Sequence, residues 1–294
     1  MVNPKSSRTC SIKNKKKKTR KFRKISFYFF LGLGNMAARF LSTMLCVGNE
    51  DVATSFCISN EGHVYSMGKN SFGAHGHDDK EPIDTPRRIP SLENIMAIAG
   101  SDSHSVCLDF KGNAFSFGRN KSHELGIRLN LGETLENSFI PIRIHLPTSI
   151  KAVSCGDKFS MCLSEDEFLY SFGNNKFGQL GHGDTEKNVY TSPKKIETLE
   201  DVEFVECGHD YTFCKTRNNV IYSWGKNNNG QLALGTRKHR SKPFECQNYP
   251  DDVVDIKCGE HHILMLTLSQ DVYSCGENYS GQLGYTYSEI PRTS

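Results

Sequence analysis

Short apolar runs separated by polar turns recur along most of the chain. The runs are four to six residues long, are rich in aromatic and β-branched residues, and are bounded by Gly, Asn, Asp or Ser. Runs of this kind are typical of β-strands. No segment keeps an apolar period of 3.6 residues, which a surface helix requires. The pattern therefore predicts an all-β protein.

The runs belong to a unit that repeats about every 52 residues. One set of glycines opens the units with spacings of 52, 56, 52 and 51, and consists of Gly48, Gly100, Gly156, Gly208 and Gly259. A second set is spaced 50, 55, 52 and 51, and consists of Gly68, Gly118, Gly173, Gly225 and Gly276. Because two independent markers share one period, we interpret the chain as a repeat protein.

Each unit predicts a small antiparallel sheet of three or four strands. The second and third runs form a hairpin, as in residues 160–163 and 168–173. We expect a fourth strand to follow a proline in four units, namely Pro86, Pro141, Pro193 and Pro243. A sheet this small cannot bury both faces alone, and radial repetition protects it. The fold class predicted is a β-propeller.

A glycine-rich phrase follows the third run of a unit. It reads FGNNKFGQLGHGD at residues 172–184, and near-copies lie at residues 225–235 and 276–284. We expect positive φ or close packing at its glycines, local hydrogen bonds from its asparagines, and insertion of its leucines between adjacent sheets. The residues concerned are Gly178, Gly181, Gly230, Gly281, Gly284, Asn174, Asn227, Asn278, Leu180, Leu232 and Leu283. No helix with a Gly-Lys-Ser/Thr start follows, so the phrase is not a phosphate-binding loop.

The pattern CGDKFSMCL…EFLYSFGNNKFGQLGHGD…SPKKI resembles the regulator of chromosome condensation repeat, and the resemblance covers about residues 41–290. It implies a propeller, usually of seven blades. This chain has four full units and a fifth that stops just after its last Gly-Gln-Leu-Gly. A five-bladed ring, an open arc and a fragment of a longer protein therefore remain alternatives. One hypothesis is that Ile25–Phe30 supplies the strand that the fifth unit lacks.

Charge divides the chain into a basic arm, residues 1–39, and an acidic body, residues 40–294. The arm has twelve Lys or Arg and no Asp or Glu, which leaves 24 basic residues against 33 acidic ones in the body. Such an arm attracts nucleic acid, an anionic membrane or an import receptor, and a solvated tail without a partner is the alternative; we expect the arm to be largely disordered. The candidate patch is Lys13, Lys15, Lys16, Lys17, Lys18, Arg20, Lys21, Arg23 and Lys24.

The apolar stretch Ile25–Leu33 within the arm is too short to cross a bilayer as a helix. The basic residues before this stretch resemble the start of a signal peptide. Two observations oppose a signal peptide: the basic region is unusually long, and the eleven cysteines show no disulfide framework. We therefore expect an intracellular protein, cytoplasmic or nuclear, without a transmembrane segment.

The sequence offers few candidates for a metal site or a catalytic site. Cys155, Cys207 and Cys258 recur at one repeat position, so we expect them a blade apart and packed as small apolar side chains. HGHDD at residues 75–79 aligns with LGHGD at 180–184, which predicts an exposed turn rather than a metal site. No catalytic constellation, cofactor site or metal site is predicted.

The sequence therefore favours a non-catalytic propeller that docks a protein partner through its blade loops. The resemblance also implies an alternative, a guanine-nucleotide releasing factor for a Ran-like small GTPase. Binding of chromatin or RNA through the arm is compatible with either function.

Overall fold

The computed structural model describes residues 41–47, 54–70, 72–127, 135–184, 186–247 and 249–285. These residues form five antiparallel sheets, or blades, and none of them forms a helix, so none forms a helix that could cross a membrane. The all-β propeller architecture is thereby confirmed.

Strand order within each blade follows the chain, so each blade is a meander. Blade 1 has β1 (Leu41–Val47), β2 (Thr54–Ser59), β3 (Val64–Gly68) and β4 (Ile83–Arg88). Blade 2 has β5 (Ile95–Gly100), β6 (His104–Asp109), β7 (Ala114–Arg119) and β8 (Asn137–Arg143). Blade 3 has β9 (Ile150–Cys155), β10 (Phe159–Ser164), β11 (Leu169–Asn174) and β12 (Val189–Lys195). Blade 4 has β13 (Val202–Cys207), β14 (Tyr211–Thr216), β15 (Ile221–Gly225) and β16 (Arg240–Glu245), and blade 5 has β17 (Val253–Cys258), β18 (His262–Thr267) and β19 (Val272–Gly276).

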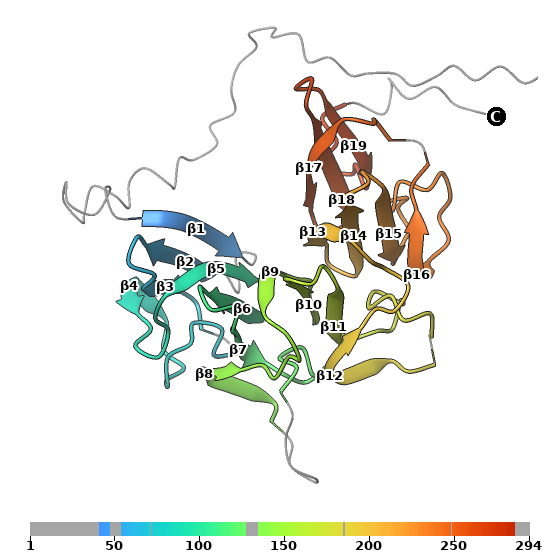
Figure 1. The fold of residues 1–294 in the computed structure, drawn as a ribbon. Helices are drawn as coiled ribbons and strands as arrows, with labels where there is room; N and C mark the ends of the chain where they lie inside the picture. Colours follow the sequence, from blue (N-terminus) through green and yellow to red (C-terminus); the bar gives the residue numbers. More distant parts are fainter. Residues whose placement is uncertain are drawn as a thin grey trace, which may run out of the picture.

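The blades are arranged side by side in an open arc, with blade 1 at one end and blade 5 at the other (Figure 1). The first strands contact one another in the order β1, β5, β9, β13 and β17, so they form the inner side of the arc. Of the alternatives left by the sequence, the described residues therefore show an arc rather than a closed ring.

The hydrophobic core lies between blades rather than within one of them. Four apolar clusters fill the four interfaces between consecutive blades. At the interface of blades 3 and 4, for example, Leu180 and Met161 share a cluster with Trp224. Each blade is thus stable only with its neighbour, as expected for stacked repeats.

The second set of glycines ends the third strands and is required by the backbone. Gly68, Gly118, Gly173, Gly225 and Gly276 have φ between 103° and 112°. A Cβ at Gly173 would also lie 2.5 Å from the carbonyl oxygen of Lys158, which is far inside van der Waals contact. A side chain at this position would meet both strain and a clash.

The prolines of the outer strands lie inside those strands, which corrects the prediction that the strands follow them. Pro86, Pro141, Pro193 and Pro243 lie within β4, β8, β12 and β16. In blade 3 the register moves from Ser171↔Lys194 to Gly173↔Tyr190, so Pro193 lies in a bulge opposite Phe172. Proline has no backbone N–H to donate. It is tolerated there because a residue in a bulge or on the free side of an edge strand does not need to donate to a neighbouring strand.

A repeated hydrogen-bond clamp holds the glycine-rich phrase against its own blade. In blade 3, Ser171 Oγ donates to the Leu180 carbonyl at 2.9 Å, and the Leu180 N–H donates to Asn175 Oδ1 at 3.1 Å. The amide group of Asn175 then donates to the Asp184 carbonyl at 2.9 Å. The clamp asparagines are Asn70, Asn120, Asn175, Asn227 and Asn278.

The sequence made predictions about the asparagines, the glycines and the leucines of the phrase, and the structure tests each of them. Asn174 bonds its own turn as predicted, since its Oδ1 accepts from the Lys176 N–H at 2.8 Å. The clamp asparagine of blade 3 is Asn175, two residues after the strand-ending glycine. The five glycines named for positive φ all have it. Leu180 and Leu232 are inserted between blades as expected, because each belongs to an interblade cluster. Leu283 is buried as well, but no following blade lies beside it among the described residues.

The clamped phrase also bonds to the next blade. The carbonyl oxygen of Gln179 accepts hydrogen bonds from Trp224 Nε1 at 2.8 Å and from Thr212 Oγ1 at 3.1 Å, both in blade 4. Ser160 Oγ donates to the Glu124 carbonyl at 2.8 Å at the preceding interface. Polar and apolar contacts therefore join each blade to its successor at the same place.

We predict that Gly173→Ala lowers the free energy of unfolding by about 3 kcal/mol or more, because the new Cβ combines strain with a backbone clash. The matched control is Gly230→Ala, which also has positive φ, 78°, but has no atom within 4 Å of the new Cβ. That control should cost only about 1–2 kcal/mol. Chemical denaturation of both variants measures the difference, and equal losses would show that the clash is relieved without cost.

Candidate functional site

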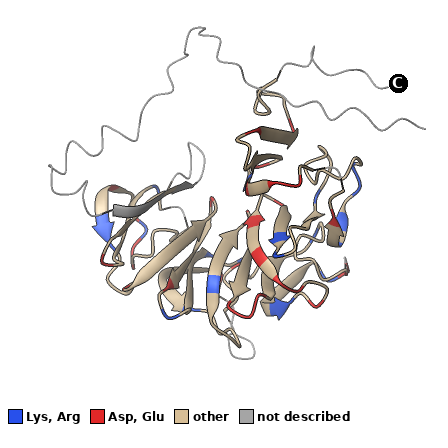
Figure 2. Ribbon diagram, turned by 45° about the horizontal axis from the view of Figure 1, so that its top comes forward, with Lys and Arg blue, Asp and Glu red and all other residues tan. Residues whose placement is uncertain are grey.

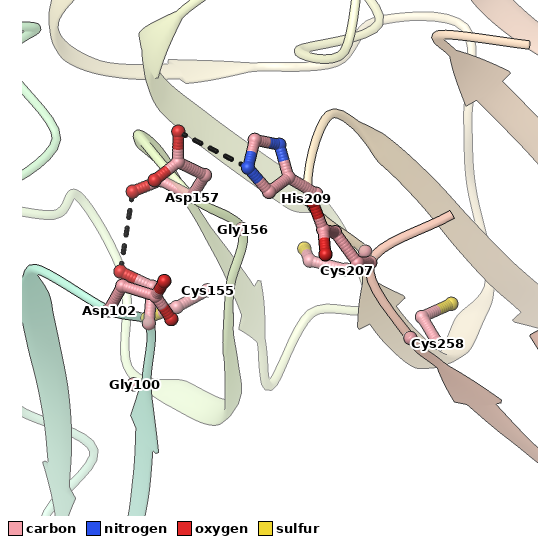
Figure 3. A pocket seen from close by; sticks show the side chains of 12 residues that line it. Gly100, Asp102, Cys155, Gly156, Asp157, Cys207, His209 and Cys258 are labelled. Atoms are coloured by element: carbon pink, nitrogen blue, oxygen red, sulfur yellow. Dashed lines mark hydrogen bonds and ion pairs between the residues drawn. The ribbon is translucent and has the colours of Figure 1, made fainter. Parts of the chain in front are cut away.

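A cavity of about 500 Å³ opens at the inner side of the arc, where the first strands of blades 2 to 5 end (Figure 3). Each of these blades contributes the last residue of its first strand and the first two residues of the following turn. The lining is Gly100, Ser101, Asp102, Cys155, Gly156, Asp157, Cys207, Gly208, His209, Cys258, Gly259 and Glu260. We call this cavity the axial pocket.

The opening glycines shape the turns of the axial pocket. A Cβ at Gly156, Gly208 or Gly259 would overlap the ring of the residue three positions later, Phe159, Tyr211 or His262. In blade 2 the equivalent position is Ser101 rather than Gly100, because the Ser101 N–H donates to the His104 carbonyl just as the Gly156 N–H donates to Phe159. Gly48 lies outside the described residues.

In blade 2, Ser101 stands at the glycine position, and the ring three positions later, His104, joins it to blade 3 through a chain of polar contacts. Ser101 Oγ lies 2.8 Å from His104 Nδ1, and His104 Nε2 lies 2.9 Å from Ser160 Oγ. Burial lowers the pKa of His104 to about 4, so this histidine is neutral at pH 7. This chain of contacts ties the turn of blade 2 to blade 3.

The residue after each turn-opening position is ionisable. These residues are Asp102, Asp157, His209 and Glu260, one from each of four successive blades. Figure 3 shows Asp157 directed toward His209, whose Nε2 lies 3.7 Å from the Asp157 carboxylate. His209 Nδ1 lies 2.9 Å from Asp210 Oδ2, and this hydrogen bond raises the pKa of His209.

The carboxylates of the axial pocket are incompletely neutralised. Asp157 has an ion pair with Lys158 at 2.7 Å, whereas Asp102 has no ion pair among the residues that the structure describes. Burial, followed by repulsion from Asp157, raises the pKa of Asp102. Since a nearby cation would relieve both effects, the pocket is suited electrostatically to a positively charged group.

Three cysteines lie at the pocket floor, where Cys155, Cys207 and Cys258 end their strands. The sequence placed them a blade apart, and they do come from three successive blades, yet they line one cavity. Burial raises the pKa of all three thiols, which makes them poor nucleophiles. No group of three or more His, Cys, Asp or Glu within the described ranges is arranged to hold a metal ion.

The two histidines of the HGHDD motif are buried, which contradicts the exposed turn predicted for them, whereas Asp78 is exposed and Asp79 is partly exposed. His75 and His77 are 0% and 3% exposed. His75 occupies the leucine position of the clamp, and His77 Nε2 lies 2.9 Å from Ser66 Oγ, as His182 Nε2 does from Ser171. The prediction failed because this turn folds back under the clamp asparagine, where Asn70 binds the Asp79 carbonyl.

Sequence reasoning missed the charged residues of the axial pocket, although the repeat contained their signal. Asp157, His209 and Glu260 each follow an opening glycine directly, so they occupy one equivalent position in successive blades. Aligning the units would have gathered them at the inner side of the arc. The basic patch at residues 13–24 lies outside the described residues and stays a prediction.

Comparison with known families supports this architecture. The model of the RCC1-like domain matches residues 53–293, which is most of the chain. The chain belongs to the RCC1-like domain family. The family resemblance read from the sequence is therefore confirmed.

Individual relatives agree with the assignment. The chain is 31% identical over 232 residues to human E3 ubiquitin-protein ligase HERC2. The aligned region covers 77% of this chain and 5% of HERC2. It is 31% identical over 236 residues to the ultraviolet-B receptor UVR8 of Arabidopsis thaliana, with coverage of 77% and 52%. The chain therefore spans about half or less of these relatives.

Among solved structures, Prp20p from Saccharomyces cerevisiae is similar with a TM-score of 0.72 and 25% identity over 86% of this chain and 60% of Prp20p. Its structure is described together with its binding to Gsp1p and histones. A second structure, human WBSCR16, has a TM-score of 0.68 at 18% identity and shows the shared fold.

We predict that His75→Leu stabilises the protein by about 1–3 kcal/mol at pH 7, because neither ring nitrogen of this buried histidine makes a hydrogen bond of normal geometry among the described residues. Burial, then repulsion from His77, lowers the pKa of His75 to about 4 from 6.5. The Lys69 backbone lies near the ring and opposes part of the lowering of its pKa. The unfolded chain therefore takes up a proton more readily, and the native protein loses stability as pH falls from about 6.5 to about 4.

The advantage of His75→Leu should consequently grow between pH 7 and pH 5 in denaturation experiments. His145→Leu, at an exposed histidine, is the matched control and should change stability by less than about 0.5 kcal/mol. A destabilised His75→Leu protein would mean that the imidazole has polar partners in solution.

Proposed function

We propose that this chain is a non-catalytic docking module whose axial pocket binds a lysine- or arginine-rich segment of a protein partner. The observation that carries the proposal is the convergence of Asp102, Asp157 and Glu260 from three blades at one cavity, with Asp102 lacking an ion pair among the described residues. A rigid set of turns holds these carboxylates before the partner arrives, so little ordering is needed on binding.

Several features of the pocket support docking rather than chemistry. The thiols are held in their unreactive form, and His104 is neutral and bonded at both nitrogens. The remaining charged groups form ion pairs that a cationic side chain can join or replace. Long-range attraction between the acidic body and a basic segment would also speed association.

A second candidate function is nucleotide exchange on a Ran-like small GTPase. The similarity to Prp20p, whose binding to Gsp1p is described, favours it. An exchange factor prefers the nucleotide-free GTPase and so weakens nucleotide binding by differential affinity. We also propose a nuclear or cytoplasmic location for the protein and binding of nucleic acid through the arm.

We predict that the triple variant Asp102→Asn, Asp157→Asn, Glu260→Gln weakens binding of a fluorescent lysine-rich peptide about tenfold or more at low salt, because it removes the charges that face the ligand. The matched control removes three exposed carboxylates far from the pocket, with Glu61→Gln, Glu93→Gln and Glu197→Gln. Fluorescence anisotropy measures both affinities. If the control loses as much affinity as the pocket variant, only overall charge matters and the pocket is not the site.

A separate assay tests exchange. A Ran-like GTPase loaded with fluorescent nucleotide is mixed with the intact chain, and nucleotide release is followed with unlabelled nucleotide in excess. The docking proposal expects release at the intrinsic rate. Acceleration of about tenfold or more would establish the second candidate, because binding alone without preference for the empty GTPase changes no release rate.

A further inference from the structure

The outward face of blade 5 is apolar and uncovered within the described residues. Leu264, Leu266 and Val272 are 37%, 40% and 41% exposed. Leu266 pairs with Val272 across β18 and β19, and Leu264 lies two residues from Leu266, so the three share one face. The opposite face, with Ile263 and Met265, packs against blade 4.

The same positions are covered in every other blade. The residue equivalent to Leu264 is fully buried in blades 1 to 4 by the blade that follows, as Phe213 is in blade 4. The residue equivalent to Val272 is likewise buried, as Ile221 is in blade 4. The face of blade 5 is therefore shaped for an apolar cover, and we call it the terminal face.

The surroundings of the terminal face are acidic. Residues 249–285 contain six Asp or Glu and one Lys, and Figure 2 shows red segments on this blade. Asp255 pairs with Leu266 across β17 and β18, which places a carboxylate on the terminal face, where it forms an ion pair with Lys257 at 3.2 Å. The other five carboxylates of these residues outnumber this one lysine. A second copy of blade 5 would bring like charges together, so the charge argues for a basic occupant.

The chain contains one segment that is both apolar and flanked by positive charge. In residues 25–30, Ile25, Phe27 and Phe29 alternate with Ser26, Tyr28 and Phe30, and the run Lys13 to Lys24 precedes them. Such a segment in extended conformation has one strongly apolar side. Residues 31–40 then lead to β1, and ten residues reach about 33 Å when extended.

The nine residues after Tyr285 have a different relation to blade 5. They include Pro291, and the outer strand of each other blade contains one proline. They follow the clamped turn of blade 5, which is the chain position that precedes the outer strand in the other blades, so they suit the edge of this sheet rather than its face.

We propose that residues 25–30 of the same chain cover the terminal face, with Ile25, Phe27 and Phe29 against Leu264, Leu266 and Val272. The basic run beside them lies near the carboxylates of blade 5. The arm thereby acts as an internal ligand that caps the open end of the arc.

The experiment uses the full chain with Val272→Cys as a reporter, and mass spectrometry follows thiol labelling at that position. The native arm should slow labelling about tenfold or more relative to a chain that also carries Phe27→Asp and Phe29→Asp. The matched control, Ser26→Asp with Tyr28→Asp, places the same charges on the other side of the segment and should keep labelling slow. Equal rates in all three chains would overturn the proposal.

Varying the protein concentration and cross-linking the chain distinguish the arm from other occupants of the terminal face. Protection that rises with protein concentration would show that a second copy covers the face, which overturns the intramolecular cap. In the full chain without the reporter, a zero-length carbodiimide reagent should join arm lysines to Asp252, Asp255 or Asp271 within one molecule. Cross-links to Asp102, Asp157 or Glu260 instead would place the arm at the axial pocket and also overturn the proposal.

Discussion

The structure depends on the clamp that holds the glycine-rich phrase between two blades. A serine of the third strand and a buried asparagine fix the backbone of one residue, such as Leu180, so that its side chain enters the next blade. The neighbouring carbonyl then accepts hydrogen bonds from that next blade. Because a four-stranded sheet cannot bury both faces alone, this contact decides whether the blades form one body.

The same contact explains where the molecule carries unused surface. In blades 1 to 4 the clamp holds the phrase against the blade that follows. Blade 5 has the same clamp, in which Ser274 Oγ donates to the Leu283 carbonyl at 2.9 Å, but no further blade follows it among the described residues. Its outward face therefore stays apolar. At the inner side of the arc, the turns are held by glycines under aromatic rings, which leaves their following residues directed into a shared cavity.

Burial controls the chemistry available in this protein more than the identity of its residues does. Histidines and cysteines are numerous, yet burial lowers the pKa of His75, His104 and His182 and raises that of the pocket thiols. These groups are therefore neutral packing elements. The carboxylates at the mouth of the axial pocket, by contrast, keep contact with solvent, so they are accessible to a ligand.

The sequence by itself determined the strands, the period and the family, because glycine at a fixed interval reports backbone conformations that only glycine adopts readily. It also identified the leucines that join the blades. It could not decide ring or arc, since closure depends on the summed angles of blades that touch only their neighbours. The burial of His75, the shift from Gly100 to Ser101 and the gathering of Asp102, Asp157 and Glu260 were decided by tertiary structure, because residues some fifty positions apart meet only when the blades pack around one inner side.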